Sequence, residues 1–403
     1  MRHLTALLVA AVLDPYGAAG NGTSDPNGAP ALVTGHAYVD TFTPGQKRYY
    51  TITVPEGASP YVSATLIRPW DSFGDSVTDE VTIGLATTDD HDCGSQDESD
   101  SQTDSVRLVT VVAEPGPART RGATWSNGFS SDDQGCGKPG TYVVSVERDR
   151  DTADQTARRI ALYYLAEPPV TGQPPSPSPV NTGKLAGPAP PDFTAAAKAV
   201  PGSDWMGTAP RVDSPVVNAT IRPGETRYWQ VPLQWGQRLS YAIRFDKVDV
   251  DDSASVGTWV VNPVRADVDT IGSDASTTYD GKGDTTPLRN STVPVAYGNR
   301  GSDSSEVDPV RFAGPYLIAL HMNPNQPLAG KDIPVHLAIR VSGSAQAGPG
   351  YQNTKDTSAR AGGTASADRH VRWEFLAGGA AALLLALLLL GWPKLTRRTA
   401  FRG

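Results

Sequence analysis

The residues best suited to chemistry form an acidic run, DDHDCGSQDESDSQTD, at positions 89–104. Hard cations such as Ca²⁺ prefer several carboxylates together with carbonyl oxygens in a flexible loop. A calcium loop formed by Asp89, Asp90, Asp92 and Asp97 is therefore one hypothesis. The run lacks the alternating acidic positions, central glycine and final glutamate of an EF-hand, so a solvated loop without metal is the competing interpretation.

Aromatic and arginine residues gather in a second stretch, RPGETRYWQVPLQWGQ, at positions 222–237. Exposed aromatic rings on a β-sheet can stack on sugars, which makes Trp235 and Tyr228 candidate ligand contacts. Arg227 and Arg48 precede aromatic pairs in two similar stretches and are candidate contacts as well. The alternative is structural: Trp229 in a core, and each guanidinium covering an aromatic face or satisfying loop carbonyls.

Enzymatic signatures are missing from the sequence. It contains no GxSxG, HExxH, SxxK or GxxxxGK[ST] motif. None of its six histidines follows a recognisable nucleophile pattern, although catalytic triads are defined by geometry rather than sequence order. We therefore expect a protein that is not an enzyme and needs no cofactor, calcium being the one exception considered.

Alternating polarity predicts short β-strands throughout the chain. In TITVP and the residues before it, Tyr50, Ile52 and Val54 lie on one face, and Tyr49 and Thr51 on the other. The stretches 107–114, 140–148 and 158–167 have the same character, and no stretch has convincing helical periodicity. The 40 glycines and 34 prolines also favour turns over long helices.

The chain repeats itself. Pro44-Gly45 aligns with Pro223-Gly224, and the residues that follow keep the same inward and outward faces. Gly140-Thr-Tyr-Val-Val likewise aligns with Gly314-Pro-Tyr-Leu-Ile late in each copy. The fold class predicted is all-β: two tandem antiparallel β-sandwiches, jelly-roll-like, plus one C-terminal transmembrane helix.

Composition places the boundaries between these parts. The predicted organisation is a signal peptide (1–20), a first sandwich (32–167), a Pro-rich linker (168–198), a second sandwich (199–343), a disordered stalk (344–373), a transmembrane helix (374–392) and a cytoplasmic basic tail (393–403). The signal peptide is predicted from an apolar run after Arg2 and from small residues at a cleavage site near Ala19.

The C-terminal apolar run predicts a single-pass plasma-membrane protein. FLAGGAAALLLALLLLGW (375–392) is uncharged, has Trp373 and Trp392 at its edges, and precedes four basic residues. The domains before it would then be extracellular, where thiols oxidise. We therefore expect the chain's two cysteines, Cys93 and Cys136, to form one disulfide. A catalytic Cys93–His91 pair is the alternative.

The net charge of −8 argues against nucleic acid as a partner. The motifs PGETRYWQVPLQWGQ, PVAYGNR and VRFAGPYLIAL resemble those of pre-peptidase C-terminal-like β-sandwiches. The whole chain resembles a group of uncharacterised surface proteins of high-GC Gram-positive bacteria with two such domains and a membrane anchor. The resemblance implies secreted, non-catalytic domains.

From this resemblance we expect an adhesion, scaffold or partner-docking ectodomain with an envelope protein as partner. A glycan- or cell-wall-binding module is the alternative, and an envelope enzyme with an unrecognised site is a third. The first copy reads VPEGASP where the second reads VPLQWGQ, so the two copies need not bind the same ligand.

Overall fold

The computed structural model describes residues 17–67, 79–100, 110–113, 138–151, 155–171, 191–248, 252–271, 275–282, 287–300, 302–325 and 327–352. The chain divides into two compact units, Met1–Gly362 and Gly363–Gly403, and all described residues belong to the first. Several predicted parts lie wholly or partly outside the described residues: 1–16 of the signal, 172–190 of the linker, Cys136, 353–373 of the stalk, the apolar run and the basic tail.

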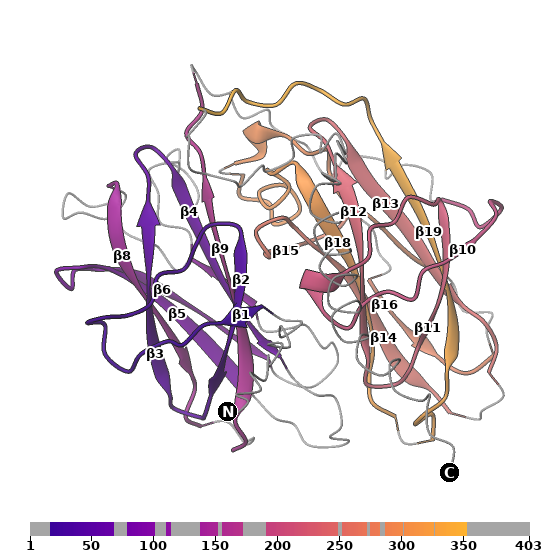
Figure 1. The fold of residues 1–403 in the computed structure, drawn as a ribbon. Coiled ribbons are helices and arrows are strands. Elements are labelled where there is room, and N and C mark those ends of the chain that lie inside the picture. Colours follow the sequence, from indigo (N-terminus) through magenta and orange to yellow (C-terminus); the bar gives the residue numbers. More distant parts are fainter. Residues whose placement is uncertain are drawn as a thin grey trace, which may run out of the picture. The chain divides into compact units, whose positions relative to one another are not determined.

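The first half of the unit is a pair of facing sheets (Figure 1). The buried side chains of both sheets form one core. One sheet has the order β1-β2-β9-β4-β7 and the other the order β3-β8-β5-β6. The strands are β1 (Ala18–Ala19), β2 (His36–Phe42), β3 (Lys47–Val54), β4 (Ser59–Ile67), β5 (Asp79–Thr87), β6 (Asp92–Asp100), β7 (Thr110–Ala113), β8 (Gly140–Arg148) and β9 (Arg158–Glu167).

The second half repeats this arrangement. One sheet has the order β10-β11-β19-β13-β17, and the other has the order β12-β18-β14-β15 with β16 also paired to β14. The elements are β10 (Lys198–Ala199), η2 (Met206–Thr208), β11 (Val216–Ile221), β12 (Thr226–Leu233), β13 (Arg238–Phe245), β14 (Ala254–Val261), β15 (Asp267–Val268), β16 (Ser276–Tyr279), β17 (Leu288–Ser291), η3 (Tyr297–Asn299), β18 (Gly314–Met322) and β19 (Ile333–Ser342). The predicted all-β class is confirmed.

The register of the ladders matches the sequence repeat residue by residue. Val54 pairs with Gly140 between β3 and β8, and Leu233 pairs with Gly314 between β12 and β18. These are the ends that the repeat aligns. The alternation predicted for β3 also holds, because Tyr50 and Ile52 are fully buried. The two repeats therefore fold with the same pairing of strands.

Short segments ahead of each repeat cover the edges of its sheets. β1 pairs with β2 in parallel, and β10 pairs with β11 in the same way. Isolated bridges then join Thr23 to Tyr49 and Ser203 to Tyr228. Residues 17–31 thus belong to the first sandwich, which begins earlier than the predicted residue 32. Covering an edge strand in this way protects it from pairing with other chains.

The acidic run departs from the loop interpretation. Its residues 92–100 form β6, which pairs with β5 in a hairpin, and residues 101–104 lie outside the described residues. β6 is the edge strand of its sheet. Backbone hydrogen bonds to β5 override the low strand propensity of Asp, Gly and Ser, and charges on an edge strand discourage further pairing.

Within the unit, the outer faces of two sheets are buried against each other. One apolar cluster combines Val39, Ile67 and Ala161 of the first half with Tyr228 and Trp259 of the second. Trp205, Met206, Val261, Leu317 and Ala319 complete it. A smaller cluster joins Tyr61 and Leu165 to Val264 and Phe312. The two sandwiches are therefore packed together rather than independent.

Candidate functional site

Arg48, a predicted ligand contact, is half-buried and bonded within its own sandwich. Its Nη1 donates to the carbonyl of Gly22 at 2.9 Å and lies 3.4 Å from Asp40 Oδ2. The Tyr50 hydroxyl donates to the same carboxylate oxygen at 3.0 Å, and the guanidinium lies 5.6 Å from the centre of the Phe42 ring. These contacts fasten the N-terminal segment to β2 and β3, as the structural alternative expects.

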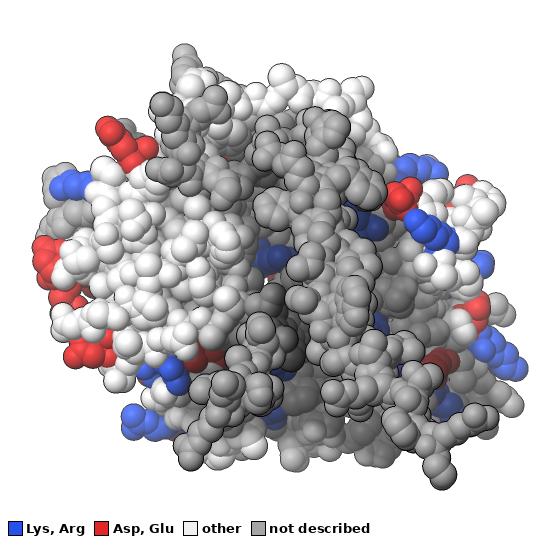
Figure 2. Space-filling model, viewed as in Figure 1, with Lys and Arg blue, Asp and Glu red and all other residues white. Residues whose placement is uncertain are grey.

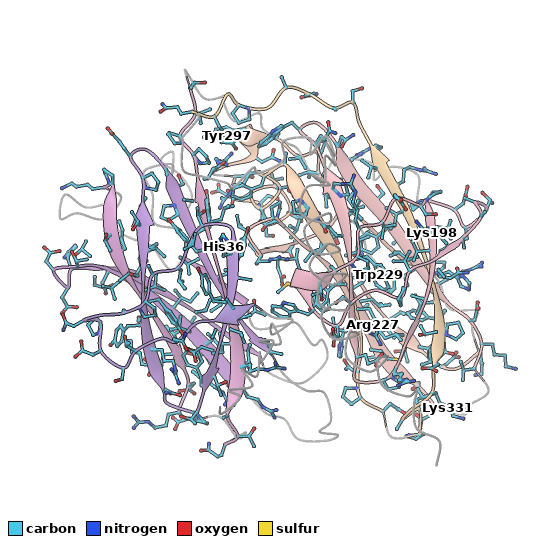
Figure 3. All side chains as sticks on the ribbon, viewed as in Figure 1. His36, Lys198, Arg227, Trp229, Tyr297 and Lys331 are labelled. Atoms are coloured by element: carbon cyan, nitrogen blue, oxygen red, sulfur yellow. The ribbon has the colours of Figure 1, made fainter. Side chains whose placement is uncertain are left out.

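The equivalent residues of the second sandwich are also used internally. Arg227 Nη2 donates to Glu225 Oε2 at 2.7 Å, and Trp229 Nε1 donates to the carbonyl of Val200 at 3.0 Å. Trp229 is fully buried in the core. Tyr297 is the aromatic neighbour of Trp235, another candidate contact. Figure 3 shows Arg227 and Trp229 well away from Tyr297 within this sandwich, so they do not form one site with Tyr297.

Tyr228, the third predicted contact, has no exposed surface. It packs edge-to-face on Trp259, with ring centres 6.5 Å apart, in the apolar cluster between the sandwiches. Alternation places it on the outer face of its sheet, but that face meets the first sandwich. Burial of the ring raises the pKa of its hydroxyl well above the usual value.

Trp235 is the aromatic candidate contact that keeps some exposure. It lies in the turn between β12 and β13, is half-buried, and has its ring centre 6.5 Å from that of Tyr297. The backbone N–H of Gln346 donates to the Trp235 carbonyl at 2.8 Å. The indole is therefore covered on one side by residues that follow β19.

The four predicted calcium ligands do not converge. Asp89 and Asp90 are exposed on the β5–β6 turn, Asp92 begins β6, and Asp97 lies five residues along the strand. At ~3.3 Å per residue, Asp92 and Asp97 are ~17 Å apart. Among the residues that the structure describes, no three His, Cys, Asp or Glu side chains are grouped to hold a metal ion.

Two of these carboxylates, those of Asp89 and Asp92, accept hydrogen bonds from neighbouring residues. Asp92 Oδ1 accepts the N–H of Gly94 at 2.8 Å. The Thr87 hydroxyl and a backbone amide hold the pKa of Asp89 below its usual value. Asp97 lies near Glu80, whose pKa is raised by partial burial and by the carboxylates of Asp97 and Asp149. The geometry favours a solvated acidic hairpin.

Cys93 lies in the core of the first sandwich with no exposed surface. Its predicted disulfide partner, Cys136, lies outside the described residues, so the disulfide stays a prediction. Cys93 Sγ lies 3.8 Å from the carbonyl oxygen of His91, and the His91 N–H donates to the Thr87 hydroxyl at 3.0 Å.

Two polar constellations were not predicted from the sequence. The first, the junction cluster, comprises Tyr61, Glu167, Arg300, Phe312 and Tyr351. The Glu167 carboxylate accepts hydrogen bonds from Arg300, from Tyr351 at 2.7 Å and from Tyr61 at 3.2 Å. The Arg300 guanidinium lies 3.7 Å from the centre of the Tyr297 ring. Arg300 belongs to the PVAYGNR motif and Phe312 to the VRFAGPYLIAL motif, and these two motifs were the sequence signals for this cluster.

The second constellation, the polar trio, comprises Asn218, His336 and Asp246 on the outer face of the β11 sheet. His336 Nδ1 lies 2.7 Å from Asn218 Oδ1, and His336 Nε2 lies 2.9 Å from Asp246 Oδ2. Both ring nitrogens are occupied, so the imidazole would have to break a hydrogen bond before exchanging a proton with a third group. The trio is better suited to ordering a polar surface than to acid–base catalysis.

No family model matches the chain, and no curated protein matches it. Solved structures similar in part include tripeptidyl peptidase 2, at 8% identity and a TM-score of 0.22, covering 77% of this chain and 24% of that one. A putative secreted protein from Parabacteroides distasonis matches at 10% identity and a TM-score of 0.18, with 78% and 91% coverage. The tandem CBM22 domains of Xyn10C from Paenibacillus barcinonensis match at 11% identity and a TM-score of 0.19, with 78% and 93% coverage.

The chain thus spans 24% of the length of the peptidase. Likeness at this level assigns no function. In the part of the chain that the structure describes, no helix is long and apolar enough to cross a membrane. The predicted membrane helix lies outside that part and stays a prediction.

Proposed function

We propose that the chain is a non-catalytic, membrane-anchored ectodomain whose two jelly-roll-like sandwiches act together as a docking scaffold for another envelope protein. The observation that carries this proposal is the apolar cluster between the sandwiches, which buries Tyr228, Trp259 and Met206. Burying a large apolar side chain contributes ~1.5–3 kcal/mol, so several of them favour one fixed arrangement over a flexible tandem.

The polar residues also support a scaffold. Arg48, Arg227 and Glu167 are engaged in contacts within the chain, as a framework requires. Figure 2 shows that the first sandwich presents a broad uncharged surface with both acidic and basic side chains at its margin. A protein partner fits such a surface better than a polyanionic wall polymer does.

The first test separates a protein partner from a cell-wall glycan. The soluble part, residues 17–371, is mixed with purified cell wall from a high-GC Gram-positive bacterium, with and without calcium, and centrifuged. We expect it to stay in the supernatant under both conditions. Co-sedimentation that is lost in Trp235→Ala and kept in His36→Ala, an exposed control, would instead establish the glycan-binding alternative.

The second test looks for the partner itself. A photo-crosslinking residue replaces Thr53, which is exposed on β3, in the full chain expressed in its own membranes. We expect one discrete crosslinked protein, and no such product when the residue replaces the buried Ile52. A ladder of unrelated products, or none from several exposed positions, contradicts docking.

A further inference from the structure

The chain does not leave the second sandwich directly after β19. Residues 343–352, here called the strap, run back to the end of β9. The Gln346 N–H donates to the Trp235 carbonyl at 2.8 Å, and the Gln352 N–H donates to the Pro169 carbonyl at 2.9 Å. Between them, the Thr171 N–H and hydroxyl both donate to the Gly350 carbonyl, at 2.5 and 2.8 Å. The strap therefore bridges the two sandwiches mainly through its backbone.

Glycines decide whether the strap fits. A β-carbon on Gly348 would overlap the indole of Trp235, and one on Gly350 would lie 2.5 Å from Thr171 Oγ1. On the opposite side, Gly236 has φ +79°, and a β-carbon there would lie 2.7 Å from the side chain of Gln346. The surface beneath the strap thus accepts a bare backbone at two positions and selects against side chains there.

Tyr351 anchors the end of the strap. Its hydroxyl donates to Glu167 Oε1 at 2.7 Å, and its backbone forms a bridge with Val170. Glu167 is only 4% exposed, so its carboxylate is well shielded from solvent. Burial and the nearby Glu167 carboxylate raise the pKa of Tyr351, so the hydroxyl stays protonated and able to donate.

The strap resembles a bound ligand more than a part of the core. Most of its residues are exposed, and only Pro349 and Tyr351 are half-buried. Its contacts are backbone hydrogen bonds, close approach at two glycines and one aromatic anchor. Recognition of extended peptides in proteins uses the same combination of main-chain bonds and side-chain positions.

We propose that Glu167, Pro169, Thr171, Trp235 and Gly236 form a binding site, the strap site, for an extended peptide of the pattern Gly-Pro-Gly-Tyr, which residues 348–351 of the chain occupy in this structure. The site does not depend on the proposed scaffold function. A tethered segment competes at an effective concentration in the millimolar range, so an external peptide binds only when the strap is displaced.

The test uses the full chain in detergent and a labelled peptide of residues 344–352, SAQAGPGYQ, followed by fluorescence anisotropy. An open variant carries Gly348→Val with Gly350→Val, which eject the strap without shortening the chain. A second open variant carries Gly350→Val with Tyr351→Ser, in case the first fails to fold. We expect each open variant to bind the peptide at least tenfold more tightly than the wild-type chain.

Peptide variants then test the recognition pattern. A peptide with Gly348→Val and Gly350→Val should lose measurable binding to the open variants. Tyr351→Phe should weaken it about tenfold, because it removes a hydrogen bond to a charged group. Ala345→Ser, at an exposed position, should change the affinity less than twofold.

Several results would overturn the proposal. Folded open variants that bind no peptide, or that bind it no better than the wild-type chain, would show that the strap site does not accept a separate peptide. Equal binding of the divaline peptide would exclude the glycine requirement. Loss of cooperative unfolding in both open variants would make the strap part of the fold and not an occupant.

Discussion

One buried ion pair distinguishes the cores of the two sandwiches. Arg148 Nε and Nη2 donate to the two carboxylate oxygens of Asp79, at 2.9 and 2.8 Å, and both side chains are fully buried. The ladders place Arg148 opposite Val81 in the first sandwich and Met322 opposite Val256 in the second. Met322 therefore takes the place of Arg148, and Ala254, two residues before Val256, takes that of Asp79.

A double-mutant cycle can therefore replace Asp79 and Arg148 by the residues found at the equivalent positions of the second sandwich, Ala and Met. Asp79→Ala and Arg148→Met should each lower the free energy of unfolding by ~3–5 kcal/mol, because each leaves a buried charge without its counterion. The double variant should recover most of that loss. Urea unfolding of residues 17–362 measures all three. The exposed pair Lys47–Glu147, 3.5 Å apart, is the control, with at most ~1 kcal/mol expected. Additive losses in the cycle would contradict this account.

His321 gives the fold a dependence on pH. Its Nδ1 lies 2.9 Å from the Thr226 hydroxyl, and burial lowers the pKa of the ring to about 3. The folded pKa lies below the unfolded value of about 6.5, so protonation favours the unfolded chain. Stability from the neutral ring is complete above pH ~6.5 and falls by up to ~1.4 kcal/mol per pH unit as the pH drops toward 3.

The measurement compares urea unfolding of the wild-type chain and His321→Gln at pH 7.5, 5.5 and 4.5. The carboxylates titrate in both proteins, so the difference between them isolates the histidine. We expect the wild-type chain to lose more stability than the variant between pH 7.5 and 4.5. Parallel pH profiles would show that the ring is solvated in the folded state.

At the scale of elements, the outer faces of equivalent sheets differ according to whether they are covered. Val39, Ala161 and Ile67 on the β2 sheet are apolar and buried against the second sandwich. The polar trio occupies the same three positions on the β11 sheet: Asn218 pairs with His336 as Val39 pairs with Ala161. On the β3 sheet, Gly84 stands where the β14 strand has Trp259. The polar trio on the β11 sheet and Gly84 on the β3 sheet therefore disfavour packing of a further sandwich against either outer face.

Restoring the apolar residues should allow the stack to continue. The changes are Asn218→Val, His336→Ala and Asp246→Ile on one face and Gly84→Trp on the other. A head-to-tail contact of this kind does not close, so it produces chains of molecules. Light scattering after size-exclusion chromatography should show a mean mass that rises with concentration in this variant. A mass equal to that of the wild-type protein at every concentration would refute the idea.

Local pattern was enough to predict several of the strands and the repeat, but not which strands pair. The Pro-Gly turns, the alternation around Tyr50 and the late Gly-Tyr strand indicated the repeat, and the structure shows that the strands at its two ends pair within each copy. The pattern could not predict that Tyr228 is buried, because its outer face is covered by residues distant in sequence. It also missed β6, whose strand depends on hydrogen bonds to β5 rather than on its own composition.

At the scale of the whole molecule, the packing between sandwiches should make them unfold together. Trp259 is 8% exposed and contacts Tyr228 in the joining cluster. Trp259→Gly copies Gly84, the equivalent residue of the first sandwich, and removes one of the two indole rings in the cluster. Calorimetry of residues 17–362 should show one transition for the wild-type chain and two for the variant. Val33→Gly, at an exposed position, should keep one transition. Two transitions in the wild-type chain would mean that the cluster is too weak to couple the sandwiches.

The course of the strap has a mechanical consequence. A pull on the chain beyond residue 352 reaches the Gln352–Pro169 bond first, then Tyr351, then Gly350, and the Gln346–Trp235 bond last. These bonds break one after another, as in unzipping. β19 lies between β11 and β13 in the middle of its sheet, where ten residues resist together. Tension at the C-terminal side would therefore peel off the strap at a force far below the one that unfolds either sandwich.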